Sequence, residues 1–224
     1  MRAYAVVRFL IWLVAKILWR ISFEGLQNIP RSGPFVLAPI HRSFIDFGLV
    51  SAVTRRPMGF MGKESLWKNR YFGAFITHLG AYPVNRGAPD RESLRRTLEL
   101  LADGKPLVLF PEGTRRSGPV IENLHEGAAY VAAKAGVPLI PVGIGGSERA
   151  LPKGKALPRL VRIHVLVGEP MIPPPIAEGA RHPSRRAIKD FTVHLQVVLQ
   201  DLFDRAQRTA GVDVPVNQSP PPDV

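Results

Sequence analysis

The 224-residue chain has no cysteine, and this absence excludes disulfides, thiolate metal sites and a cysteine nucleophile. Covalent chemistry through an acyl-cysteine is therefore ruled out. The chain has six histidines, and no two of them stand at a spacing typical of metal ligands. We therefore expect no metal site.

The chain also has no long hydrophobic run free of charge. Residues 1–22 are rich in Ile, Leu, Val and Trp, but basic residues interrupt them, so a simple transmembrane helix is not expected. On a helical wheel the basic residues fall within an arc of roughly 120°; they are Arg2, Arg8, Lys16 and Arg20. This pattern predicts an amphipathic membrane-binding helix whose Trp12 and Trp19 enter the acyl boundary.

Two alternatives for this N-terminal helix stay open: a helix packed on the protein, and a signal segment, although no small-residue cleavage site supports a signal.

Acidic residues are few, at 18 against 30 basic ones, which gives a formal charge of +12. Such a charge favours polyanions: nucleic acid, anionic lipid or phosphorylated ligands. Because familiar nucleic-acid motifs and interleaved aromatics are missing, we expect no nucleic acid partner.

Short apolar runs alternate with helical patterns after the first helix, which is typical of an α/β fold. The predicted strands are 35–39, 58–61, 80–84, 107–110, 137–144 and 162–167. The predicted helices are 43–54, 71–78, 90–102, 124–135 and 184–209, with Gly104 and Gly136 marking two helix ends and Ser184 capping the last helix. We expect one domain with a mixed, mostly parallel sheet flanked by helices.

The chain length and composition fit a single core, which divides the sequence into three parts. Residues 1–22 form the membrane-association helix, residues 23–210 the main domain, and residues 211–224 a Pro-rich tail with the composition of a disordered end.

His41 and Asp46 form an HxxxxD pair where the predicted strand 35–39 gives way to a helical pattern. Five residues of regular helix turn the side chains about 140° apart, so His41 must precede the helix if the two are to meet. With Ser43 as the helix cap, Asp46 would lie in the first turn and reach back to the imidazole. A neutral His41 held in this way predicts a general base.

A second motif, FPEGTR, covers residues 110–115 and follows another predicted strand. Gly113 would let the backbone approach a ligand closely, and Arg115 could bind a phosphate through two hydrogen bonds. Lys63 and Arg86 also follow strand-like runs and are further candidate cations. Solvated surface charge is the alternative for all three cations.

Four ordered blocks make the chain similar to the PlsC-like glycerolipid acyltransferase family, the lysophosphatidic acid acyltransferases. The blocks are HRSFID at 41–46, GAYPVNR at 80–86, FPEGTR at 110–115 and VPLIPVGI at 137–144, with a partial match in GKE at 62–64. The chain departs from the family at Ile40, where Asn is usual, and at Asn85, where Asp is common. These departures bear on subfamily and acceptor choice.

The resemblance implies an acyltransferase that moves a fatty-acyl group from a thioester to a glycerol-phosphate-type hydroxyl. It implies that His41 is the general base with Asp46 as its partner, and that Arg115, Arg86 and Lys63 hold the acceptor phosphate. Glu112, Gly113 and Thr114 would shape the acceptor pocket, although a buried Glu112 equally suits a scaffold role that accepts hydrogen bonds from backbone amides.

The family also implies no cofactor, with acyl-CoA or acyl carrier protein as the thioester co-substrate. We expect a peripheral or monotopic protein on the cytoplasmic face of the cell membrane, where a lysophospholipid enters from an anionic surface. The leading acceptor is 1-acylglycerol 3-phosphate, giving phosphatidic acid; glycerol 3-phosphate and other lysophospholipids remain alternatives. A serine hydrolase is disfavoured because no GxSxG motif is present, and a non-catalytic binding module for anionic lipid or nucleic acid remains the rival class.

Overall fold

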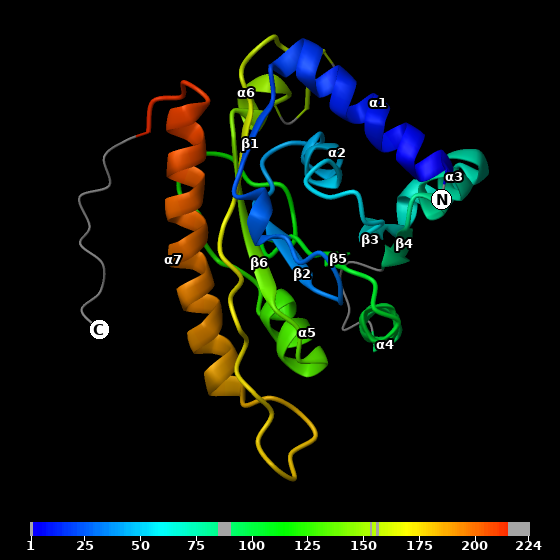
Figure 1. Cartoon of the computed structure of the whole chain (residues 1–224), viewed down its shortest axis with the longest axis vertical. Coiled ribbons are helices and arrows are strands. Elements are labelled where there is room, and N and C mark those ends of the chain that lie inside the picture. Colours follow the sequence, from blue (N-terminus) through cyan, green and yellow to red (C-terminus); the bar gives the residue numbers. More distant parts are fainter. Residues whose placement is uncertain (1, 85–90, 153, 156, 215–224) are drawn as a thin grey trace.

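The computed structural model describes residues 2–84, 91–152, 154–155 and 157–214, which form an α/β domain around a seven-stranded sheet (Figure 1). The strand order is β1-β7-β6-β2-β5-β3-β4, and every neighbouring pair is parallel except β6 and β7. The strands are β1 (Ser22–Glu24), β2 (Val36–Pro39), β3 (Gly59–Lys63), β4 (Ala81–Val84), β5 (Leu107–Val108), β6 (Leu139–Gly145) and β7 (His164–Val167). The predicted mixed, mostly parallel sheet is confirmed.

Helices flank this sheet. They are α1 (Arg2–Trp19), α2 (Asp46–Ser51), α3 (Arg70–His78), α4 (Arg91–Ala102), α5 (Gly127–Ala135), α6 (Ser147–Ala150) and α7 (Arg185–Thr209), with short 3-10 turns at Leu26–Asn28 and Glu64–Lys68. The central strands β2 and β6 are buried throughout, as expected for parallel strands covered on both faces. The hydrophobic core therefore surrounds β2, the strand that leads directly to His41.

Helix α7 lies unusually close to β6, and two glycines make this possible. A Cβ atom on Gly145 would stand 2.0 Å from the carbonyl oxygen of Ala206, and one on Gly143 would stand 2.4 Å from that of Leu202. Leu195, Leu199 and Phe203 of the same helix belong to the main core. The small residues of β6 therefore let the long C-terminal helix pack directly on the sheet.

Most predicted elements exist within a few residues of their expected bounds, including the α7 cap, where the backbone N–H of Ala187 donates to Ser184 Oγ. Gly136 ends α5 with φ of 64°, as expected of a left-handed helix end. Strand β1 and helix α6 were not predicted. The predicted cap of the helix after His41 was wrong: Ser43 does not cap it, because α2 begins at Asp46 with Ile45 as its cap.

The N-terminal helix forms as predicted, and within the described residues no helix is long and apolar enough to cross a membrane. Its Trp19 does not face outward, however, so the expectation that this side chain enters a bilayer was wrong. Trp19 is buried, and its indole N–H donates to the carbonyl of Arg159 at 3.1 Å, which satisfies the polar end of the ring inside the protein. Helix α1 instead packs on α2, where Ile11 lies against Gly48.

Candidate active site

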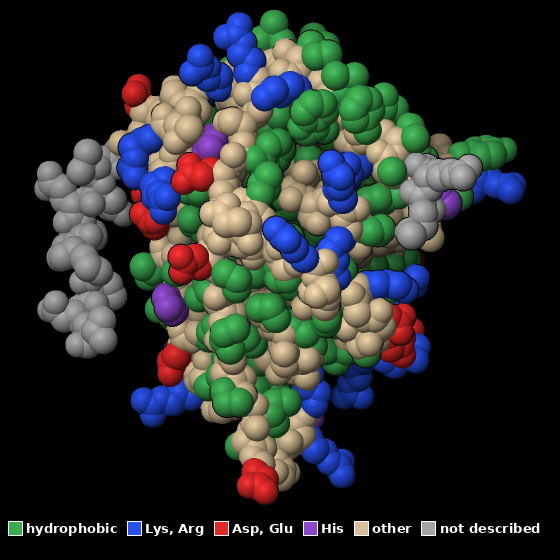
Figure 2. Space-filling view, viewed as in Figure 1, with side chains coloured by type: hydrophobic (Ala, Val, Ile, Leu, Met, Phe, Trp, Pro, Cys, Tyr) green, Lys and Arg blue, Asp and Glu red, His purple; other side chains and the backbone are tan. Residues whose placement is uncertain are grey.

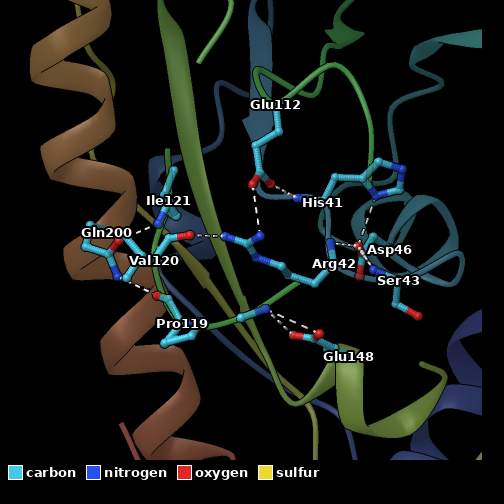
Figure 3. Close-up of polar contacts among 11 residues, drawn as sticks. His41, Arg42, Ser43, Asp46, Glu112, Pro119, Val120, Ile121, Glu148 and Gln200 are labelled. Carbon is cyan, nitrogen blue, oxygen red and sulfur yellow. Dashed lines mark hydrogen bonds and ion pairs between the residues drawn. The ribbon is translucent and has the colours of Figure 1, made fainter. Parts of the chain in front are cut away.

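The sequence-predicted histidine and glutamate come from neighbouring parallel strands. His41 follows β2, and Glu112 lies beyond β5, which is paired directly with β2. Because parallel strands end at the same edge of a sheet, both side chains reach one site at its carboxyl edge (Figure 3). This is the edge at which open α/β sheets bind ligands.

His41 and Asp46 are in contact and both are buried. His41 Nδ1 lies 3.1 Å from Asp46 Oδ2. A carboxylate at this distance accepts a hydrogen bond from Nδ1–H, so the lone pair of the neutral ring lies on Nε2. The arrangement therefore leaves Nε2 as the basic nitrogen.

Asp46 is fixed by the backbone of the same loop. Its Oδ2 accepts hydrogen bonds from the N–H groups of Arg42 and Ser43, each at 2.7 Å. Ser43 turns its hydroxyl away and donates to the carbonyl of Leu151 at 2.7 Å. The aspartate, rather than the serine, thus closes the turn that brings His41 back over the start of α2.

The FPEGTR segment holds the main chain of His41 on both sides. The His41 N–H donates to Glu112 Oε2 at 2.6 Å, and the His41 carbonyl accepts from the N–H of Arg116 at 2.9 Å. The imidazole itself packs against Phe110 and Phe47, with ring centroids 4.2 and 5.1 Å away, and these two rings also contact each other. Backbone and ring are therefore both fixed before any ligand arrives.

Arg42 is a residue that the sequence reasoning missed. Its guanidinium is buried, lies 3.2 Å from Glu112 Oε1 and donates to the carbonyl of Val120 at 2.9 Å. It also lies over the ring of Phe203, 5.2 Å from the centroid. The available signal was the position of this arginine, which directly follows His41 and stands just before the apolar residues Phe44 and Ile45.

Glu112 has the geometry of a scaffold carboxylate, bonded to the His41 N–H and paired with Arg42. Burial raises the pKa of Glu112, and the nearby Arg42 cation and the His41 N–H act in the opposite direction. The acidic side chain therefore ties the two motifs together from within the protein. The Glu112 side chain is fully buried and has no access to solvent.

The segment after FPEGTR is anchored from three directions (Figure 3). Gln200 accepts a hydrogen bond from the Ile121 N–H at 2.7 Å and donates to the Pro119 carbonyl at 3.0 Å. Glu148 accepts from the Gly118 N–H, at 3.3 Å for the nearer oxygen, and Arg42 donates to Val120 as above. The main chain next to Arg115 and Arg116 is thus held in place.

Arg115 is half-buried, and among the described residues no carboxylate lies within ion-pair distance of it. Gly113 has φ of 65°, and a Cβ atom there would stand 2.6 Å from the ring of His125, so glycine is required by the turn itself. Thr114 is exposed beside it. Lys63 is the last residue of β3, with its side chain outside the described structure, and Arg86 lies outside the described residues.

Within the described part of the chain, no group of three or more His, Asp and Glu side chains could hold a metal ion. What the site offers instead is an oriented imidazole with a free Nε2, beside a half-buried arginine. This arrangement suits the removal of a proton from a hydroxyl near an anionic group.

Comparison with known proteins gives a family match over residues 20–145, to the family described as Acyltransferase. A 1-acyl-sn-glycerol-3-phosphate acyltransferase of Bacillus subtilis is 29% identical over 180 residues, covering 80% of this chain and 86% of its own length. A lyso-ornithine lipid O-acyltransferase of Pseudomonas aeruginosa is 28% identical over 148 residues, covering 65% of this chain and 56% of its own length.

A solved structure supports the fold independently. The crystal structure of the 1-acyl-sn-glycerophosphate acyltransferase PlsC from Thermotoga maritima matches with a TM-score of 0.75 and 24% identity. The match covers 90% of this chain and 78% of that one. The predicted α/β architecture therefore agrees with a known structure over almost all of the chain.

Proposed function

Because the chain belongs to the acyltransferase family, among its PlsC-like glycerolipid members, we propose that it transfers a fatty-acyl group from a thioester to 1-acylglycerol 3-phosphate, giving phosphatidic acid. The observation that carries the proposal is the buried contact of His41 Nδ1 with Asp46 Oδ2, at the carboxyl edge of the sheet. The name of the Bacillus subtilis relative supports the choice of acceptor.

In the proposed reaction His41 Nε2 removes the proton of the acceptor hydroxyl as its oxygen attacks the thioester carbonyl. A C–O bond forms, the C–S bond breaks, and the thiolate leaves with the proton that His41 returns. Asp46 keeps Nδ1 protonated and stabilises the imidazolium that forms during transfer. No acyl-enzyme is formed, so we expect sequential rather than ping-pong kinetics.

Arg115 is our candidate for the acceptor phosphate, with Arg86 and Lys63 as further predicted contacts. A guanidinium matches two phosphate oxygens at once, and Arg115 has no carboxylate partner among the described residues to compete with a ligand. Thr114 and the turn at Gly113 are proposed to border this pocket. Glu112 is proposed to stabilise the pocket indirectly, because it accepts the His41 N–H and pairs with Arg42.

We propose that α1 lies on an anionic bilayer and presents the site to lysolipid. One face of the helix exposes large apolar side chains at helical spacing; they are Val6, Phe9, Leu10, Leu13, Val14 and Ile17. Figure 2 shows hydrophobic side chains gathered over this helix at the upper right. Lys and Arg side chains lie near the end of the helix at the top of the view. Since α1 packs on α2, the helix that begins at Asp46, the bilayer would lie close to the site.

The donor is proposed to be acyl-CoA or acyl carrier protein. Both are polyanions, which suits a chain of charge +12. We keep the cytoplasmic face of the cell membrane, the absence of a cofactor and the absence of a nucleic acid partner as predictions.

The test is acyl transfer by the purified full chain in mixed micelles, with palmitoyl-CoA or palmitoyl carrier protein as donor. The acceptors are 1-acylglycerol 3-phosphate, glycerol 3-phosphate and a lyso-ornithine lipid. We expect turnover of 1-acylglycerol 3-phosphate, reduced by about 10²–10⁴-fold in a folded His41→Ala variant. His194→Ala, on α7, is the matched control and should keep full activity.

A second variant tests the phosphate contact. Arg115→Gln should raise KM for 1-acylglycerol 3-phosphate by about tenfold or more while leaving the lyso-ornithine acceptor, which has no phosphate, unaffected. Equal product from wild type and His41→Ala would refute the general-base mechanism. No turnover with either donor type would favour the binding-module alternative.

A further inference from the structure

A second exposed apolar surface lies beside α1, on residues 157–162, which we call the 157–162 segment. It has the sequence LPRLVR, belongs to the connection between α6 and β7, and has no regular secondary structure. Leu157 is 83% exposed and Leu160 is 76% exposed, which places both among the most exposed large hydrophobic side chains described. Two such leucines in four residues form an apolar tip rather than an isolated surface contact.

Arginines alternate with these leucines. Arg159 and Arg162 are exposed, and no carboxylate of the described residues is within ion-pair distance of either. Apolar tips flanked by cations are the composition that places side chains in the acyl boundary and cations among lipid phosphates. The segment thus complements an anionic bilayer in both chemistry and charge.

The position of the segment is fixed by the end of α1. Trp19, the last residue of α1, donates its indole N–H to the Arg159 carbonyl at 3.1 Å and accepts the Ile163 N–H on its own carbonyl at 3.0 Å. The Arg159 N–H donates to the Ala150 carbonyl at 2.7 Å. Figure 1 shows the connection from α6 arching beside this end of α1. The burial of Trp19 therefore holds the segment next to the membrane-facing helix.

The other end of the same connection touches the site. Ser43, whose N–H donates to Asp46 Oδ2, donates its hydroxyl to the carbonyl of Leu151. Leu151 follows α6 directly, six residues before Leu157. The connection that carries the segment is therefore held by α1 on one side and by the His41 loop on the other.

We propose that the 157–162 segment is a second membrane-contacting element, which inserts Leu157 and Leu160 into an anionic leaflet while Arg159 and Arg162 bind lipid phosphates. The proposal rests on the proposed function in that it takes α1 to lie on the same bilayer. It adds a contact beside the C-terminal end of α1, so the molecule would touch the membrane with two elements rather than with α1 alone.

The experiment measures vesicle binding separately from catalysis. The full chain is sedimented with vesicles of phosphatidylcholine containing phosphatidylglycerol, and with vesicles of phosphatidylcholine alone. The double variant Leu157→Asp/Leu160→Asp should bind the anionic vesicles at least about tenfold more weakly. The matched control, Ile172→Asp/Val197→Asp, adds the same charge in a groove beside α7 and should change binding less than about twofold.

A second pair of substitutions separates the contribution of the arginines from that of the leucines. Arg159→Gln/Arg162→Gln should weaken binding to anionic vesicles while leaving the weaker binding to phosphatidylcholine unchanged. Wild-type affinity in the leucine variant, or an equal loss in the α7 control, would overturn the proposal. Acyl transfer to a water-soluble short-chain lysolipid is the companion readout. This activity should be unchanged in all three double variants, whereas its absence in wild type would count against the proposed function and not against this contact.

Discussion

The loop of residues 41–46 leads into α2, on which α1 packs, yet the loop and α1 invert the usual distribution of side chains. The loop buries histidine, arginine and aspartate, and Glu112 with them, while α1 exposes a row of large apolar side chains. Buried polar groups are stable only with partners, and the loop supplies these from its own backbone and from FPEGTR. The apolar row is exposed in the described protein, although Phe9 stacks on Trp12, and an exposed row of this kind is typical of a contact surface.

The sharpest way to test the polar side of this comparison is Asp46→Asn. The amide can still accept the N–H groups of Arg42 and Ser43, so we expect a folded protein, but it stabilises an imidazolium poorly. kcat should fall by about 10²–10⁴-fold with little change in KM. Steady-state kinetics checks this, with the exposed Asp190→Asn of α7 as control. An unchanged kcat would contradict the role of Asp46.

Breaking the buried ion pair should have the next largest effect. Arg42→Met leaves Glu112 buried without its cation, so we expect the free energy of unfolding to fall by about 3–5 kcal/mol. Adding Glu112→Gln should recover part of the loss, because the uncompensated charge is then gone. Urea unfolding of both single variants and the double variant measures this coupling. Strictly additive losses would show that the two side chains act independently.

The close packing of α7 on β6 can be tested with a single methyl group. Gly145→Ala places a Cβ atom against the Ala206 carbonyl, so unfolding should become easier by about 1–3 kcal/mol. Gly127→Ala, at the exposed start of α5 with no atom in the way, should instead stabilise by about 0.5–1 kcal/mol. Thermal unfolding of the two variants compares an interior and a surface glycine directly.

Changing the apolar row should affect membrane binding and leave the fold intact. We expect Phe9→Ser/Leu13→Ser to lower affinity for anionic vesicles by about tenfold, which is about 1.4 kcal/mol. The free energy of unfolding should fall by no more than about 1 kcal/mol, because both side chains lie outside the buried core, although Phe9 also stacks on Trp12. A large loss of stability would mean that α1 is an ordinary core-covering helix.

The smallest expected effect concerns His164 on β7, the strand next to the edge strand β1. Burial lowers the pKa of His164 below its usual 6.5, against the opposing effect of Glu24. The unfolded chain therefore binds a proton more readily, so this group costs no stability above pH 6.5 and reduces it as pH falls below 6.5. His164→Gln should flatten that part of the profile. Urea midpoints at pH 7.5 and 5.5 for both proteins provide the test.

The sequence predicted the strands and the histidine–aspartate contact because both leave local signals: short apolar runs and a fixed five-residue spacing. It missed β1, since Ser22–Glu24 contains a single apolar residue and pairs with a strand far along the chain. It also missed the Arg42–Glu112 ion pair, because the partners lie 70 residues apart and meet only when β2 pairs with β5. Trp19 was assigned outward since its acceptor, the Arg159 carbonyl, lies 140 residues away in the sequence.

Strand β1 also affects the order in which the molecule is completed. It precedes the other described strands in the sequence, yet within the described residues it pairs only with β7, and the hydrogen bond between Ser22 and His164 spans 142 residues. At roughly 5–20 residues per second, synthesis of that interval takes about 7–28 s. During this time the strand that pairs with β1 has not been made, and neither have the Arg159 and Ile163 groups that form hydrogen bonds with Trp19. The edge of the sheet at β1 can therefore be completed only late in synthesis.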